Sequence, residues 1–261
     1  MKNPTQRLFL KPLKILGILS LVSLFFSCSQ EDDFTEIRYA LSLQTQMDAS
    51  VTRATADNTW EGNEQVQVSI DDKKATPFIA ARSGTLTPVT PLFWESSIQA
   101  ISARAWYPAS WKMKPDQSTS DDYQEADFIF AKTVSEITLA NYAKKAGKLT
   151  FSHQMAKVIA NLTGENISSV SEVAFYGFTS GKANTTTGVI ENGKNNKWIK
   201  AYNKEENSYE ALLIPQKMEA GSKFIQVTID SSSNYYYTLV SDVSLEAGEL
   251  YIYNITLKKT D

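Results

Sequence analysis

The chain has 261 residues, of which 26 are basic and 29 are acidic, so its formal net charge is −3 at pH 7. An acidic balance argues against nucleic acid as a partner, because binding to phosphates depends on clustered Lys and Arg. A single cysteine excludes an internal disulfide, and a single histidine leaves no Cys/His cluster for a transition metal. The length fits one large domain or two smaller ones, each with its own core.

Residues 1–27 have the pattern of a secretory signal peptide. The chain starts with a basic stretch, and an apolar run follows over residues 15–26. This run is shorter than the roughly 20 residues that a membrane-spanning helix needs, so export with cleavage is favoured over a transmembrane anchor. Removal of this segment, with its four basic residues, would leave a net charge of about −7.

Cys28 follows the apolar run directly, after Ser27. This arrangement is typical of a bacterial lipoprotein, whose cysteine becomes the acylated first residue of the mature chain. The acidic segment 29–33 resembles the signal that directs such lipoproteins to the outer face of the outer membrane. We therefore expect lipid attachment at Cys28, a linker over residues 28–36 and a surface-exposed location. The alternative is a secreted protein that discards Cys28.

Beyond the signal, apolar and polar residues alternate with a period of two, which is typical of half-buried strands. The first strand is expected to place Ile37, Tyr39, Leu41 and Leu43 on one face. Further strands are expected at residues 66–70, 101–107, 225–229, 235–239 and 250–257. Short alternating strands at this spacing predict an all-β sandwich or barrel.

Three stretches break the pattern. Residues 112–126 and 179–197 are polar, and both are predicted to be loops. Residues 139–146 are predicted to form a short surface turn of helix. A domain boundary is expected near Gly147, with about 110 residues on each side.

Eight motifs occur in an order that resembles the fimbrillin family of Bacteroides-like bacteria, and together they cover nearly the whole chain. They are the lipoprotein signal with the strand at 39–43, then residues 52–54, 60–68, 105–108, 126–131, 149–158, 213–216 and 245–255. One departure is Asn63-Glu64, where relatives usually show Gly-Asp followed by an apolar residue.

This resemblance implies two tandem transthyretin-like (Greek-key) β-sandwich domains, at residues 37–147 and 148–261. It also implies a role as a pilus subunit, a pilus tip or anchor, or a related surface adhesin. Other fimbrial subunits would be the partners, joined by donor-strand addition. Residues 258–261 end the chain soon after the last motif, which favours a subunit at the tip or base that accepts a strand.

In family members that polymerise, a trypsin-like protease cuts after an arginine that follows the first strand, and a strand from the next subunit fills the groove. Arg53 stands at that place, among small polar residues typical of an accessible loop. The resemblance therefore implies cleavage at Arg53. An ordinary surface arginine is the alternative.

No residue is assigned a catalytic, cofactor-binding or metal-binding role, and the protein is not expected to be an enzyme. His153 on an apolar strand is predicted to be a satisfied core residue. The acidic group Asp121, Asp122, Glu125 and Asp127 has oxygen ligands for a hard cation such as calcium, but its spacing favours a solvated acidic turn.

Two other functions remain open. A surface adhesin that does not polymerise would bind a host glycan or protein, and Trp94, Trp106 and Trp111 offer rings for stacking on sugars. Core packing is favoured for Trp94 and Trp106. A surface glycoside hydrolase is the third hypothesis, although no pair of carboxylates stands out.

Overall fold

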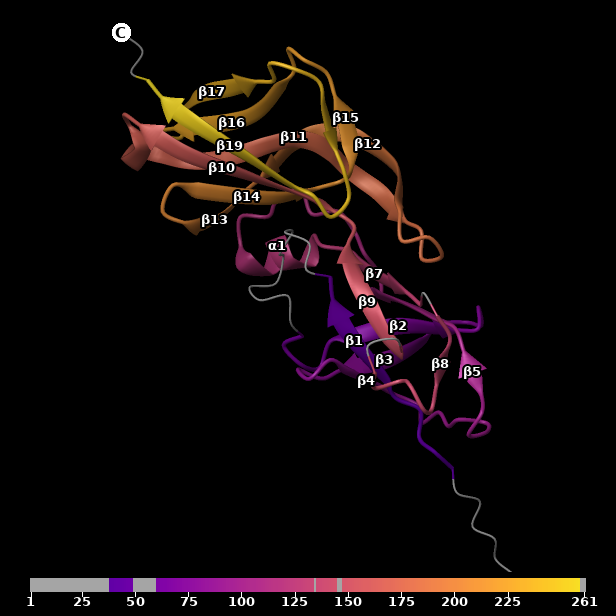
Figure 1. Cartoon of the computed structure of the whole chain (residues 1–261). Coiled ribbons are helices and arrows are strands. Elements are labelled where there is room, and N and C mark those ends of the chain that lie inside the picture. Colours follow the sequence, from indigo (N-terminus) through magenta and orange to yellow (C-terminus); the bar gives the residue numbers. More distant parts are fainter. Residues whose placement is uncertain (1–37, 49–59, 134, 145–146, 259–261) are drawn as a thin grey trace, which may run out of the picture. The chain divides into compact units, whose positions relative to one another are not determined.

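The computed structural model describes residues 38–48, 60–133, 135–144 and 147–258 (Figure 1). Strands dominate these ranges, and the helical elements are short, as in α1 (Ser120–Glu125) and the 3-10 turn η2 (Ile167–Ser169). The predicted all-β fold class is confirmed. Within the described ranges, no helix is long and apolar enough to cross a membrane.

Seven strands from the first part of the chain form one closed sheet. They are β1 (Leu43–Met47), β2 (Gln65–Ile70), β3 (Thr76–Ala80), β4 (Thr85–Pro88), β6 (Ala103–Tyr107), β7 (Ile129–Lys132) and β9 (Lys148–His153). Their order around the sheet is β1-β4-β3-β2-β6-β7-β9. All neighbours are antiparallel except β1 and β9, which run parallel and close the ring. A separate pair joins β5 (Ala100–Ile101) to β8 (Ile137–Thr138).

The later strands form two four-stranded sheets, drawn from salmon through orange to yellow in Figure 1. The first contains β10 (Ala156–Gly164), β13 (Tyr202–Glu205), β14 (Ser208–Leu213) and β19 (Leu250–Leu257), in the order β13-β14-β10-β19. The second contains β11 (Val170–Ala183), β12 (Ile190–Lys200), β16 (Lys223–Ile229) and β17 (Ser233–Thr238), in the order β12-β11-β16-β17. A short pair joins β15 (Gln216–Met218) to β18 (Val243–Leu245).

Side chains from these two sheets meet in one hydrophobic core. Phe224 of β16 is fully buried, and its ring centroid lies 5.3 Å from that of Tyr253 on β19. Val158 and Ala160 of β10 are also fully buried in this cluster. The two sheets therefore pack face to face, as in a β-sandwich.

Two tight turns show how the local sequence forms hairpins. Asp71 and Asp72 between β2 and β3 both have positive φ angles, of 49° and 56°. Asp230 and Ser231 between β16 and β17 likewise have φ angles of 49° and 59°. Two consecutive residues with positive φ match the right-handed twist of the strands that they join, and Asp adopts this conformation more readily than most residues.

Most of the predicted strands are confirmed. The strands expected at 66–70, 225–229, 235–239 and 250–257 correspond to β2, β16, β17 and β19, and the one at 101–107 is split between β5 and β6. The first strand begins later than predicted, at Leu43. Leu41 and Leu43 are buried as expected, but Tyr39 is 48% exposed. Ile37 lies outside the described residues.

The predicted loop at 179–197 holds only for residues 184–189, which form the turn between β11 and β12. The residues on either side belong to these two strands, which pair as a hairpin through Ser180↔Lys194 and Lys182↔Glu191. The predicted loop at 112–126 holds for its first part only, because α1 begins at Ser120 with Thr119 as its N-cap. Residues 139–143 form successive hydrogen-bonded turns where a turn of helix was expected.

The change from the closed sheet to the two later sheets occurs after the predicted boundary at Gly147. Strand β9, which was assigned to the second domain, pairs with β1 and β7 of the closed sheet. The next strand, β10, pairs only with strands of the later sheets. The division at 147/148 and the transthyretin-like assignment remain predictions.

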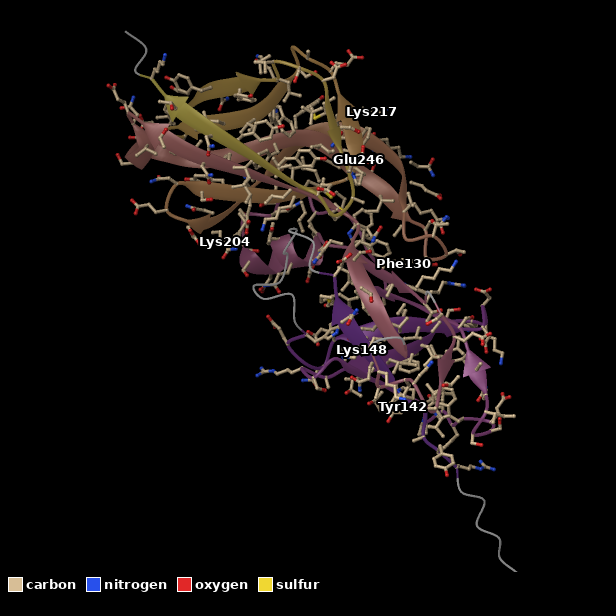
Figure 2. All side chains as sticks on the ribbon, viewed as in Figure 1. Phe130, Tyr142, Lys148, Lys204, Lys217 and Glu246 are labelled. Atoms are coloured by element: carbon tan, nitrogen blue, oxygen red, sulfur yellow. The ribbon has the colours of Figure 1, made fainter. Side chains whose placement is uncertain are left out.

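Apolar side chains connect the two groups of strands. Trp106 and Phe130, which face each other across β6 and β7, belong to the same core cluster as the strands after β10. Gly188 in the β11–β12 turn has a φ of 82°, and a Cβ there would lie 2.5 Å from Cδ1 of Phe130 (Figure 2). The ring of Phe130 therefore packs directly on that turn.

Candidate assembly site at strand β1

Strand β1 completes the closed sheet by lying between β4 and β9. It pairs with β4 through Leu43↔Leu86 and Gln44↔Thr85. It pairs with β9 over four positions, from Gln44↔Lys148 to Met47↔Phe151. Both backbone edges of β1 are therefore occupied. Without this short strand, β4 and β9 would each present an unpaired edge to another chain.

The inward face of β1 is apolar at its start and polar at its centre. Leu41 and Leu43 are buried, and Leu43 is fully inaccessible. Thr45 is 5% exposed, and its hydroxyl donates to the carbonyl of Gly84 at 2.9 Å while accepting from the Trp60 indole N–H at 2.9 Å. The buried hydroxyl thus has both a donor and an acceptor, so its burial carries no large penalty.

The close approach of the β3–β4 turn to β1 requires Gly84. Its φ is 81°, and a Cβ at this position would lie 2.9 Å from the backbone oxygen of Thr45. The same turn accepts the N–H of Thr45 at 2.8 Å. Glycine here permits both the turn and the contact, because it carries no side chain and adopts positive φ without strain.

The outward face of β1 carries polar contacts to both neighbours. The amide of Gln44 donates to the Thr85 hydroxyl at 2.8 Å, and the amide of Gln46 donates to the Thr150 hydroxyl at 2.9 Å. Both faces of β1 therefore make specific contacts. A shift of the pairing by one residue would exchange the two faces, so these contacts fix the register of the strand.

The two sites predicted from sequence, the lipidation site Cys28 and the cleavage site Arg53, lie outside the described residues. The described chain stops at Asp48, directly after β1, and resumes at Trp60. Both assignments remain predictions.

His153 at the end of β9 is buried, as expected of a core residue, with 4% of its surface exposed. Its Nδ1 lies 2.6 Å from Oδ2 of Asp127. Burial lowers the pKa of His153, but the charge of Asp127 and the hydrogen bond to it raise the pKa, and the net result lies above the usual 6.5. The prediction of a satisfied core residue is therefore confirmed in part, because Nδ1 has a partner whereas Nε2 has none.

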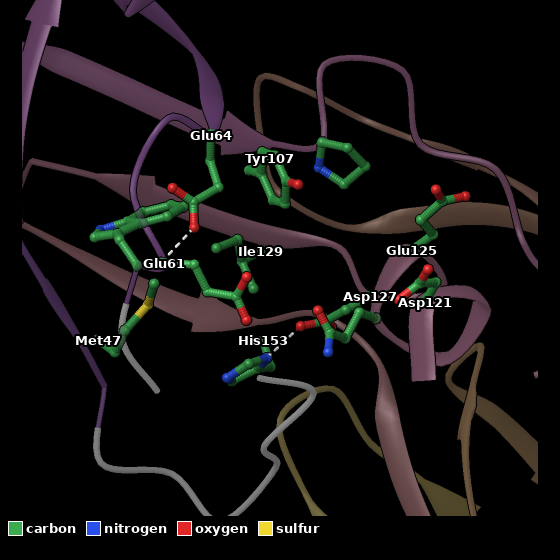
Figure 3. A pocket seen from close by; sticks show the side chains of 12 residues that line it. Met47, Glu61, Glu64, Tyr107, Asp121, Glu125, Asp127, Ile129 and His153 are labelled. Atoms are coloured by element: carbon green, nitrogen blue, oxygen red, sulfur yellow. Dashed lines mark hydrogen bonds and ion pairs between the residues drawn. The ribbon is translucent and has the colours of Figure 1, made fainter. Parts of the chain in front are cut away.

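A cavity of about 280 Å³ lies beside this pair (Figure 3). In the view of Figure 3, Glu61 and Glu64 lie to one side of the His153–Asp127 pair, and Asp121 and Glu125 lie to the other. The remaining lining residues are Met47, Trp60, Tyr107, Pro108, Gln124 and Ile129. Met47 is the last residue of β1, so the cavity adjoins the end of the candidate assembly site.

The acidic group at residues 121–127 does not converge on one point. Asp122 and Glu125 both pair with Lys114, and Asp127 pairs with His153. Within the described part of the chain, no group of three or more His, Cys, Asp or Glu side chains has the arrangement of a metal site.

Of the three tryptophans considered for sugar stacking, two are buried and one is partly buried. Trp94 and Trp106 are 5% and 8% exposed, as core packing predicts. Trp111 is partly buried and donates its indole N–H to the carbonyl of Ala126 at 2.8 Å. Trp198 on β12 is partly exposed and was not among the tryptophans considered from the sequence. It directly follows the segment 179–197, which was predicted to be a loop.

A family model described as fimbrillin-like matches residues 52–261. A search of curated proteins found no match. Among solved structures, the fold is similar to that of a Bacteroides uniformis protein with a suggested role in cell adhesion. The TM-score is 0.64 at 16% identity, over 86% of this chain and 94% of that chain.

Two further structures, from Bacteroides ovatus and Bacteroides thetaiotaomicron, also carry a suggested role in cell adhesion. The first has a TM-score of 0.61 at 18% identity, over 84% of this chain and 92% of that chain. The second has a TM-score of 0.56 at 16% identity, over 84% of this chain and 96% of that chain. At such identities the likeness shows the fold, whereas the family model covers most of the sequence. The chain belongs to the fimbrillin-like family.

Proposed function

We propose that this protein is a fimbrial subunit with a role in cell adhesion, held at the cell surface by a lipid on Cys28 and assembled by donor-strand addition. Membership of the fimbrillin-like family supports the fimbrial or adhesive role. The position of β1 supports the assembly mechanism. This five-residue strand is paired on both edges and is directly followed by the segment that contains Arg53.

The intact chain holds β1 firmly. Burying a Leu side chain contributes about 1.5–3 kcal/mol, and Leu41 and Leu43 are both buried. A cut after Arg53 removes none of these contacts. It makes the strand a separate peptide, however, and its release then gains the translational freedom that the covalent link denied. A strand from another subunit, with apolar residues at alternate positions, can then take its place between β4 and β9.

A labelled peptide with the sequence of residues 38–48 tests this mechanism. Protein cleaved with trypsin should take up the peptide, and protein with Arg53→Ala should not. A matched peptide in which Leu41 and Leu43 are replaced by Ser should not compete, because it cannot fill the buried positions. Equal uptake by cleaved and Arg53→Ala protein would show that this cut does not release β1 from its place between β4 and β9.

We propose further that the subunit accepts a strand at the tip or base of a pilus. Strand β19 supports this position, because it pairs with β10 along its whole length, from Lys157↔Leu250 to Gly164↔Leu257. It is therefore engaged in its own sheet and is not free to be donated. Cleaved protein on its own should form no long filaments in electron micrographs. Long filaments would contradict the tip or base position.

The second candidate is a surface adhesin that binds a host glycan without polymerising. On the second later sheet, the Trp198 ring centroid lies 5.2 Å from that of Tyr176 and 5.6 Å from that of Tyr236. A hollow of about 520 Å³ adjoins this aromatic group, and its lining includes Asn196 and Lys217. Aromatic faces with polar neighbours suit stacking on a sugar ring. Binding on a glycan array that is lost with Trp198→Ala would support this function.

A further inference from the structure

The cavity beside His153 contains two buried polar atoms that the protein leaves without a hydrogen-bond partner. They are Nε2 of His153 and Oδ1 of Asp127, whose residues are 4% and 7% exposed. Each unsatisfied group costs about 1–3 kcal/mol. Both residues line the cavity, so a ligand bound there lies next to them (Figure 3).

The same cavity is rich in carboxylates, and only some of them are satisfied by the protein. Glu64 accepts the backbone N–H groups of Glu61 and Gly62, and Glu125 pairs with Lys114. Among the described residues, the carboxylates of Glu61 and Asp121 form no ion pair or hydrogen bond. The lining includes no Lys or Arg. The cavity therefore carries an excess of negative charge.

The open polar atoms are acceptors when His153 is neutral. The Asp127 carboxylate accepts the Nδ1–H of His153, so in the neutral imidazole, which prevails above its raised pKa, Nε2 carries a lone pair. The free Oδ1 of Asp127 and the carboxylates of Glu61 and Asp121 are acceptors as well. A ligand that satisfies this set must bring a positive charge and several N–H donors in different directions.

We propose that this cavity binds an alkylguanidinium group, such as the side chain of an arginine. A guanidinium group offers five N–H donors in one plane, whereas an ammonium group is a compact and strongly hydrated charge. Its weak hydration and flat face suit a partly enclosed site with aromatic walls, here Trp60 and Tyr107. At about 280 Å³, the cavity lies just below the usual range for small-molecule sites, which fits a group the size of one side chain.

This site adjoins β1 through Met47, but its proposed polar contacts differ from those that hold β1 in the sheet. Its ligand would contact Glu61, Asp121, Asp127 and His153, none of which lies on β1. Failure of peptide uptake at β1 and failure of guanidinium binding would therefore be separate results.

Calorimetric titration of the purified, uncleaved protein with n-butylguanidinium, and with n-butylammonium as the matched amine, at a pH above the titration of His153, tests the proposal. We expect saturable binding of the guanidinium compound and at least about tenfold weaker binding of the amine. Since a hydrogen bond to a charged group is worth about 1.5–3 kcal/mol, the Glu61→Gln/Asp121→Asn protein should bind the guanidinium compound at least about tenfold more weakly. The matched control, Glu205→Gln/Glu206→Gln at the end of β13 and in the turn after it, makes the same change in net charge and should leave the affinity unchanged.

His153 provides a readout that needs no substitution, because it is the single histidine of the chain and gives one set of imidazole NMR signals. These signals should shift on addition of n-butylguanidinium. An acetylated and amidated Gly-Arg-Gly peptide then distinguishes the two sources of the group. Binding of the peptide assigns a polypeptide arginine, and binding of n-butylguanidinium alone assigns a free small molecule. The absence of saturable guanidinium binding, equal affinity for the amine, or an equal loss in the control variant would overturn the proposal.

Discussion

Gln117 shows what side-chain context adds to a sequence pattern. It lies in a polar stretch that reads as a loop, yet it is fully buried. Its Nε2 donates to the carbonyl of Leu212 at 2.9 Å, and its Oε1 accepts the N–H of Leu212 at 2.8 Å. Strand β13 pairs with β14 only as far as Glu210, so Gln117 takes the place of the missing strand neighbour. A partner 95 residues away cannot be read from local composition.

His153 could be predicted to lie in the core, because it continues the alternation of Leu149 and Phe151 along an apolar strand. Its pairing with Asp127 could not be predicted, since the two residues are 26 positions apart and meet only when β7 and β9 pair. Asp127 was instead grouped with its acidic neighbours in sequence. The cavity that joins these groups is a property of the folded chain alone.

The folded protein should become less stable as the pH rises through the titration of His153. Its pKa is raised above the usual 6.5 by the charge and hydrogen bond of Asp127, with a smaller contribution from Asp48, against the opposing effects of burial and Lys157. A raised pKa in the folded state means that the protonated form stabilises the fold. This contribution is complete below about pH 6.5 and is lost as the pH rises through the folded pKa.

Urea denaturation between about pH 6 and about pH 8 measures this effect. The free energy of unfolding should fall with rising pH in the wild type and change less with His153→Gln, which cannot titrate. An equal slope in both proteins would show that another group causes the pH dependence.

At the scale of elements, sequence patterns locate strands best where one face is buried. The alternation at residues 225–229 and 66–70 gave β16 and β2 nearly to their ends. The hairpin ends of β11 and β12 were not predicted as strands, because residues such as Thr179, Lys194 and Asn195 leave both faces partly or fully exposed. Backbone pairing holds these strands, and it needs no alternation of side chains.

The parallel pairing of β1 with β9 could not be predicted from the sequence either. It joins Gln44 to Lys148 across more than a hundred residues. The predicted boundary at Gly147, which leaves about 110 residues on each side, falls between these two paired strands. Pairings between distant segments depend on the whole topology, whereas turns and alternation are local.

The stability of the sheet that contains β10 and β14 should depend strongly on the buried ion pair between Lys157 on β10 and Glu210 on β14. The Nζ–Oε2 distance is 2.6 Å, and the two side chains are 5% and 4% exposed. Glu210→Gln removes the carboxylate that faces the buried Lys157 ammonium, so it should lower the free energy of unfolding by about 3–5 kcal/mol. The exposed pair Lys200–Glu172 gives the control, since Glu172→Gln should cost about 0–1 kcal/mol. Equal and small losses in urea denaturation would contradict this ranking.

At the scale of the whole molecule, the sequence predicted the fold class and the family, and both are confirmed. The family was predicted from the order of the motifs, since strand alternation alone fits many all-β folds. The connection between the closed sheet and the later sheets was not predicted. It depends on Trp106, Phe128 and Phe130, which precede the later strands in sequence but share their core cluster.

This shared core leads us to expect that residues 38–258 unfold in a single cooperative transition. Hydrogen exchange with mass spectrometry should show peptides from β1–β9 and from β10–β19 losing protection at the same denaturant concentration. Phe130→Ala should cost about 3–5 kcal/mol, as large-to-small changes of a buried aromatic do, and should also separate the two transitions, because the contact with Gly188 is lost.

Phe224→Ala is the matched control for this coupling. Phe224 is fully buried between the two later sheets, with Phe175 and Tyr253 as ring neighbours. Its loss should cost a similar amount but fall within one group of strands, so the later strands should lose stability without a new break between the groups. If the wild type already unfolds in two steps, or if Phe224→Ala separates the transitions as far as Phe130→Ala does, the packing of Phe130 on the β11–β12 turn is not what couples the two groups of strands.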